Sequence, residues 1–136
     1  MLNKMEIEKL FKNLILIDFA LLILIVISSI YQPNEFIEIT KNLDKGILSN
    51  YANLTRILSL ILFFLYILTL NLLYRFVFYA RNLYFFVIIA GLLLNFFNGS
   101  VIYTSFGSLL DQIGGITSGA ILILIFYSPV KENFNK

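Results

Sequence analysis

Apolar residues fill four long stretches of the chain, and polar or charged residues gather in the segments between them. A helix that crosses the hydrocarbon core of a bilayer needs about 20 mostly apolar residues. Four stretches meet this requirement, at about 13–31, 56–75, 82–103 and 112–130, and residues 32–55 connect the first two. The pattern predicts an all-α fold in which the whole chain forms one integral membrane domain, a four-helix bundle.

The first stretch could be a cleaved signal peptide or a membrane-spanning helix. The first stretch follows a basic segment, as a signal peptide does, but its apolar core exceeds the usual 7–15 residues and no small-x-small cleavage site follows. We expect an uncleaved membrane anchor.

The third and fourth stretches almost touch, and Gly107 and the Gly114-Gly115 pair lie near their junction. Because glycine interrupts helices, these residues predict a hairpin with its turn at residues 104–108.

Lysine and arginine predict the orientation, since they are enriched in cytoplasmic segments. With the N-terminus inside, seven of the ten lie on the inner side and three on the outer side. The inner residues are Lys4, Lys9, Lys12, Arg75, Arg81, Lys131 and Lys136, and the outer ones are Lys41, Lys45 and Arg56. This predicts that both termini are cytoplasmic (N-in/C-in) and that the protein lies in the inner, or plasma, membrane.

The connection between the first two stretches carries a second pattern. From Glu35 to Tyr51, apolar residues recur three or four positions apart, and polar residues fall between them. This spacing predicts an amphipathic helix in the outer loop. Such a helix could contact a partner at the outer surface, or it could rest on the interface because its apolar face has no other place. We favour the second interpretation.

Composition narrows the possible functions. Hydrophobic residues make up 60% of the chain and charged residues 13%, against roughly 45–50% and about 25% in soluble domains. The chain has no cysteine and no histidine, which excludes thiol catalysis, disulfides, histidine-based triads and Cys/His metal sites. A net charge of +2 without a basic tract argues against nucleic acid binding. We expect neither enzymatic activity nor a cofactor.

Asp18 is the acidic residue inside the first stretch. A carboxylate at the centre of a membrane helix costs about 2.5–3.5 kcal/mol on insertion scales. Asp18 follows Lys12 by about 9 Å of helix, and Asn71 precedes Arg75 by about 6 Å. Because Asp18, Asn71 and Arg75 share one depth, we predict that their side chains form a polar contact between two helices, which we call a structural tie. The alternative interpretation is a proton or cation site.

Small and polar residues share one helix face in each of the last two stretches. Because small residues let helix backbones approach closely, and asparagine can hydrogen-bond between helices, they predict a packing seam between these stretches. The alternative is a solvated vestibule. The residues of the predicted seam are Gly91, Asn95 and Asn98 on the third stretch and Gly115, Ser118 and Gly119 on the fourth.

The C-terminal segment runs from Ile125 to Phe134 and contains an aromatic-Ser-Pro-aliphatic-Lys pattern. It resembles the C-terminus of uncharacterised small bacterial four-span inner-membrane proteins. That resemblance implies a bacterial inner membrane and no particular activity. Three function classes remain: a non-enzymatic accessory or stabilising subunit, which we favour, an oligomeric transporter or channel, and a membrane-resident immunity or defence protein. The expected partners are the lipid bilayer and either further copies of the chain or another membrane protein.

Overall fold

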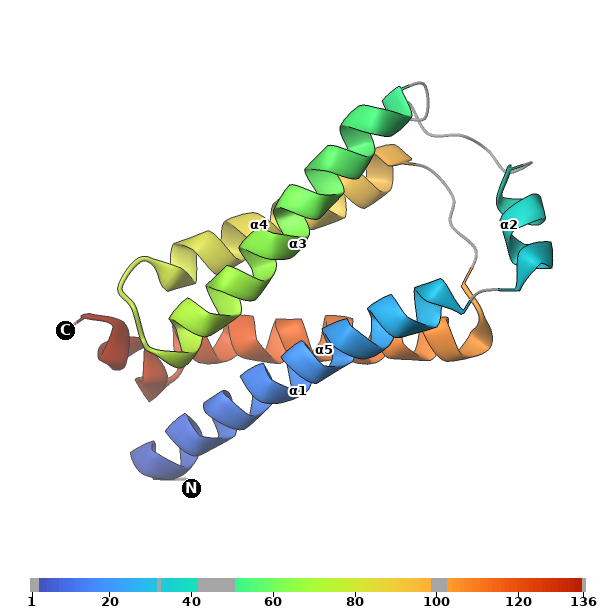
Figure 1. Cartoon of the computed structure of the whole chain (residues 1–136). Coiled ribbons are helices and arrows are strands. Elements are labelled where there is room, and N and C mark those ends of the chain that lie inside the picture. The colour runs from blue at the N-terminus through green and yellow to red at the C-terminus, as the bar shows by residue number, and fades with distance from the viewer. Residues whose placement is uncertain (1–2, 32, 42–50, 99–102, 136) are drawn as a thin grey trace.

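The computed structural model describes residues 3–31, 33–41, 51–98 and 103–135 (Figure 1). These residues form helices, and no strand occurs among them, so the all-α prediction is confirmed. In chain order the helices are α1 (Lys4–Ile30), α2 (Asn34–Lys41), α3 (Ala52–Tyr74), α4 (Ala80–Asn98), α5 (Ser105–Tyr127) and the 3-10 helix η2 (Pro129–Asn135).

Within the described ranges, four helices are long and apolar enough to cross a membrane: α1, α3, α4 and α5. Only 17–22% of the most apolar window of each is buried inside the protein. The remaining apolar surface faces outward, and exposing it to water would cost about 25 cal/mol per Å². A bilayer removes that cost, which supports a multi-pass membrane protein.

The long helices form two pairs, with α1 packed along α5 and α3 packed along α4 (Figure 1). The pairs converge at the end that holds both termini and the α3–α4 turn, which we call the terminal end. They diverge toward the opposite end, the loop end, where α1 leads to α2 and α4 leads to α5. We call the corresponding parts of the bundle the terminal half and the loop half.

The sequence of α1 explains how it fits α5. Its buried side chains are Phe11, Ile15, Asp18 and Leu21, which are three or four positions apart and therefore share one helix face. At the loop end, a side chain added at Gly107 would place its Cβ 3.5 Å from the Ser28 hydroxyl oxygen. This is an ordinary van der Waals distance, so α1 and α5 lie in direct contact at Gly107.

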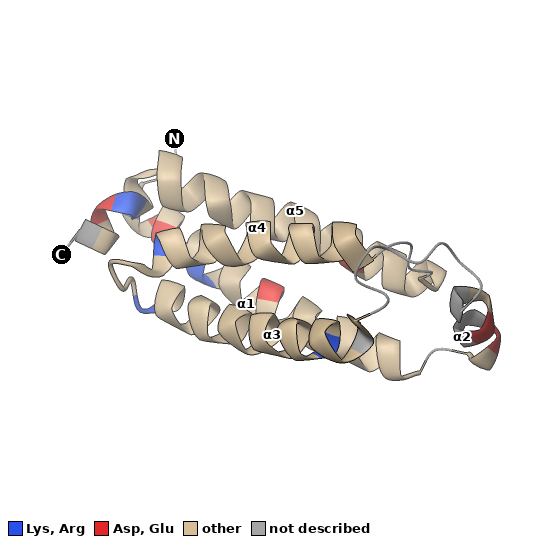
Figure 2. Ribbon diagram, turned by 90° about the horizontal axis from the view of Figure 1, so that it is seen from above, with Lys and Arg blue, Asp and Glu red and all other residues tan. Residues whose placement is uncertain are grey.

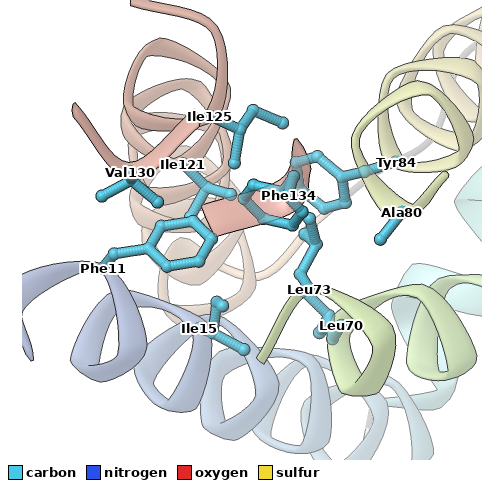
Figure 3. Close-up of a cluster of buried hydrophobic side chains, with 10 residues drawn as sticks. All are labelled: Phe11, Ile15, Leu70, Leu73, Ala80, Tyr84, Ile121, Ile125, Val130 and Phe134. Carbon is cyan, nitrogen blue, oxygen red and sulfur yellow. The ribbon is translucent and has the colours of Figure 1, made fainter. Parts of the chain in front are cut away.

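The core of the described protein lies in the terminal half. Figure 3 shows the Phe134 ring among side chains of the four long helices. The C-terminal helix η2 folds back under the bundle and buries both Val130 and Phe134 completely. The Phe134 ring contacts Phe11 and Phe76 edge-on, at centroid distances of 6.1 Å and 5.3 Å. Such aromatic pairs contribute about 0.5–1.5 kcal/mol beyond their buried area.

The α3–α4 turn contains a strained residue. Phe76 has φ of 57°, a left-handed conformation that costs roughly 1–2 kcal/mol for a residue with a side chain. Its ring stacks on Phe11 at 5.7 Å, and the Lys12 ammonium lies 5.3 Å from its centroid. These contacts hold the ring in the core and offset the backbone strain.

The start of the fourth span differs from the expectation, and the expected outer helix is described only in part. Helix α5 begins at Ser105 rather than near residue 112, because the Thr104 side chain accepts a hydrogen bond from the Gly107 amide at 3.0 Å and caps the helix there. The Gly114-Gly115 pair therefore lies inside a helix. In the outer connection the structure has α2, which covers the first part of the expected helix from Glu35 to Tyr51, and residues 42–50 lie outside the described residues.

Candidate functional site

Asp18 is the acidic side chain that the bundle buries, with 3% of its surface exposed. The other buried polar side chains of the described residues are Thr69 and Thr117. Both threonines donate a hydrogen bond to a carbonyl of their own helix, Thr69 to Leu65 and Thr117 to Ile113. Asp18 differs, because its hydrogen bonds join separate helices.

Two hydroxyl groups contact the carboxyl group of Asp18. The Tyr66 hydroxyl on α3 donates to Oδ2, and the Ser118 hydroxyl on α5 donates to Oδ1 at 3.3 Å. The two hydroxyl oxygens lie 3.2 Å from each other. We call Asp18, Tyr66 and Ser118 the polar cluster. It links α1, α3 and α5 and thus connects the two helix pairs.

The fourth long helix contributes Tyr84, which is fully buried. Its ring lies 5.9 Å from the Tyr66 ring, centroid to centroid, at a tilt of 30°. Among the described residues, the Tyr84 hydroxyl has no partner at ordinary hydrogen-bond geometry, although it lies near the Ser118 and Tyr66 hydroxyls. A buried hydroxyl usually finds a partner, since leaving one unpaired costs about 1–3 kcal/mol. The Tyr84 hydroxyl thus adds a fourth polar group beside the three side chains of the polar cluster.

The structure corrects the expected partners of Asp18. Asn71 and Arg75 are both exposed, whereas Tyr66 and Ser118 hold the carboxyl group. At about 100° per residue, Asn71 points about 140° away from Tyr66 around α3, and Arg75 points about 180° away. The prediction was wrong because it matched the positions of these residues along the helix axis and ignored the direction in which each side chain points around the helix.

The polar cluster also lies deeper than we expected. Tyr66 precedes the C-terminal end of α3 by eight residues, or about 12 Å of helix. Ser118 precedes the C-terminal end of α5 by nine residues, or about 14 Å. With a hydrocarbon core about 30 Å thick, the cluster lies near the middle of the spans rather than in the cytoplasmic third, where we expected Asp18.

The predicted seam between the last two spans is also corrected. The close partner of α5 is α1, and α4 meets α5 over only a short stretch. A Cβ added at Gly91, Gly115 or Gly119 would have no neighbour within 4 Å. Asn95 is exposed and Asn98 is partly buried at the end of α4.

The geometry of α5 explains this outcome. Gly107 and Gly114 are seven residues apart and point in nearly the same direction, toward α1. Gly115 and Gly119 point about 80° and about 120° away from Gly107. Ser118, which we assigned to the seam, instead joins the polar cluster.

Sequence reasoning missed Tyr66, although the sequence carries a signal for it. Membrane tyrosines gather near the ends of spans, and Tyr66 lies in the middle of one. Its hydroxyl cannot reach the headgroups and needs a polar partner within the bundle. Asp18 is the acidic residue that an inward-facing tyrosine at this depth could meet.

The chemistry of this set of side chains is limited to hydrogen bonding and to holding a proton. The described residues contain no group of three or more His, Cys, Asp or Glu side chains that could bind a metal. One carboxyl group and three hydroxyls offer a divalent cation a single anionic ligand, fewer than such sites generally use.

Comparison with known proteins found no match: no protein-family model, no curated protein and no solved structure is similar to this chain. The resemblance of the C-terminal segment to small bacterial four-span proteins therefore stays a prediction.

Proposed function

We propose that this chain is a non-enzymatic accessory or stabilising subunit of the inner membrane, with both termini in the cytoplasm. The supporting observation is the bonding of Asp18. Its carboxyl group is buried and hydrogen-bonded by side chains of two other helices. In a carrier the acid must meet water during the transport cycle, whereas here it ties the helix pairs together.

The proposed orientation places the terminal end in the cytoplasm. In Figure 2 blue ribbon segments mark lysine and arginine near both termini and the α3–α4 turn. Because the chain has no cysteine, single-cysteine variants give an unambiguous test. A membrane-impermeant thiol reagent applied to intact cells should label Glu35→Cys and leave Lys131→Cys unlabelled. Both positions are exposed, so the reverse labelling would overturn the orientation.

The accessory role predicts dependence of another membrane protein on this chain. In cells that carry the gene, its deletion should lower the abundance of at least one other membrane protein, as measured by quantitative proteomics of membranes. The wild-type chain should restore that abundance, and a Phe134→Ala variant that lacks the core ring should restore it less. Unchanged abundance of every other membrane protein would contradict the proposal.

A transporter or channel is the second candidate, because a buried carboxyl group and the buried Tyr84 hydroxyl lie together inside the bundle. Reconstituted vesicles separate the two functions. We expect proton and monovalent cation flux at the level of protein-free vesicles. Flux above that level that is abolished by Asp18→Asn, but not by Asp111→Asn, would replace the accessory role by transport.

A further inference from the structure

The polar cluster contains three hydrogen-bond contacts arranged in a closed ring. Tyr66 contacts one carboxyl oxygen of Asp18, Ser118 contacts the other, and the two hydroxyl oxygens contact each other. Each of these contacts needs one hydrogen between its two oxygens. The hydroxyls of Tyr66 and Ser118 supply two hydrogens for three contacts, so one is missing.

The protonation state of Asp18 decides whether the ring is complete. If Asp18 is ionised, both hydroxyls donate to it, and no hydrogen lies between the Tyr66 and Ser118 oxygens at 3.2 Å. If Asp18 carries a proton on Oδ2, it donates to Tyr66, Tyr66 donates to Ser118, and Ser118 donates to Oδ1. Each contact then holds one hydrogen, and the observed geometry is fully satisfied.

We propose that Asp18 is an intramembrane proton-binding site and that the closed ring is its proton-bound form. Uptake takes one proton from water and forms one O–H bond on the Asp18 carboxylate. Release reverses that step, and no other covalent bond changes. This goes beyond an accessory role, because it makes the tie between the two helix pairs dependent on one bound proton.

The charged and titratable groups around the polar cluster agree with a neutral carboxyl group. Tyr66 on α3 and Tyr84 on α4 are the titratable groups beside it, and α5 presents Ser118. Among the described residues, the causes that shift the protonation of Asp18 include no cation, and two cations of the terminal half lie over aromatic rings: Lys12 lies 5.0 Å from the Tyr74 centroid, and Arg81 lies 5.7 Å from that of Phe134. An ionised carboxylate buried without a paired cation is strongly disfavoured in a low-dielectric interior.

Loss of the proton weakens the link between the helix pairs. The ionised carboxylate attracts both hydroxyl hydrogens, so the contact between Tyr66 and Ser118 loses its hydrogen bond. This contact joins α3 to α5, one helix from each pair. The direct contact between the two helix pairs at this site is therefore complete only when the proton is bound.

Carbon-13 NMR of the full chain in lipid nanodiscs tests the proposal directly. The chain has three aspartates, Asp18, Asp44 and Asp111, so protein labelled at the aspartate carboxyl carbon gives three signals. At neutral pH we expect the Asp18 signal at the position of a protonated carboxyl group and to reach the carboxylate position only under alkaline conditions. Three carboxylate signals at neutral pH would overturn the proposal.

The assignment does not depend on one variant. Asp18→Asn removes the Asp18 signal, and if that variant does not fold, Asp44→Asn and Asp111→Asn identify it by elimination. The ring itself is tested by Ser118→Ala, which should move the Asp18 signal. The matched control is Thr117→Ala, which removes the neighbouring buried hydroxyl that is bonded to Ile113 and should leave the signal in place. Equal effects of the two variants would disprove the ring.

Discussion

The terminal half and the loop half of the bundle are built on different principles. In the terminal half, large side chains from the long helices and η2 form one core. On the side of this core nearest the middle of the helices, the polar cluster joins the two helix pairs by hydrogen bonds. In the loop half the pairs diverge, and Gly91 and Gly115 have no close neighbours. Both halves are apolar, so hydrophobicity alone does not explain which half packs.

Lipid accounts for this difference. Because lipid tails are as apolar as leucine, burying an apolar side chain between membrane helices brings little hydrophobic gain. Association then depends on close packing and on hydrogen bonds between helices. The terminal half has both kinds of contact, whereas in the loop half the close contact is within a pair, at Gly107 and Ser28. The two halves should therefore respond differently to mutation.

The largest expected effect is that of Phe134→Ala. This ring is fully buried between Phe11 and Phe76, and truncating a buried phenylalanine to alanine costs about 3–5 kcal/mol. Phe96→Ala is the control in the loop half, since 78% of the Phe96 side chain is exposed. Thermal unfolding in detergent should show a large loss for Phe134→Ala and almost none for Phe96→Ala. Similar losses would mean that the core does not hold the bundle.

The next effect concerns the polar cluster. Asp18→Leu leaves the Tyr66 and Ser118 hydroxyls without their hydrogen-bond partner on α1, at about 1–3 kcal/mol for each buried group left unpaired. Asp18→Asn keeps a carbonyl oxygen and adds amide hydrogens, so it can still accept and donate within the ring. Thermal unfolding in detergent should rank wild type above Asp18→Asn and Asp18→Asn above Asp18→Leu. If Asp18→Leu matched wild type, the cluster would not tie the helix pairs.

A smaller effect compares two glycines of α5. Gly119 lies in open space, so Gly119→Ala should raise thermal stability through helix propensity, by about 0.5–1 kcal/mol. At Gly107 an added Cβ would lie 3.2 Å from the Thr104 hydroxyl oxygen and 3.5 Å from that of Ser28. Gly107→Ala should therefore bring a smaller gain or a loss. A clear loss at Gly119 would instead indicate a neighbour in the membrane, such as a second copy of the chain.

The difference between lipid-facing and protein-facing contacts also explains which sequence predictions were correct. The apolar stretches are long enough to reveal the four candidate spans, because length is the property that a bilayer selects. They do not show which face packs, because lipid-facing and protein-facing positions are both apolar. Tyr66 and Asn71 illustrate this: both lie on α3, but one faces the interior and the other is exposed. Similarly, Gly107 faces α1 while Gly119 does not, although both lie on α5.

The smallest expected effect tests how the terminal end is closed. The ammonium group of Lys4 lies 2.7 Å from a carboxylate oxygen of Glu132, which joins the start of α1 to η2. The hydrogen bond from Lys4 lowers the pKa of Glu132 below its usual value. A group whose pKa is lower in the folded state stabilises that state above its unfolded pKa, and this stability is lost as pH falls through the folded pKa.

Wild-type protein should therefore lose a little thermal stability as the pH falls below the usual pKa of a glutamate side chain. Glu132→Gln should lack this part of the pH dependence, and high salt should reduce it, because both side chains are exposed. Glu35→Gln, which changes an exposed acid at the loop end, is the matched control and should keep the wild-type pH dependence. If Glu132→Gln keeps it too, the salt bridge does not fasten η2, and the buried side chains of Val130 and Phe134 hold this helix in place without electrostatic help.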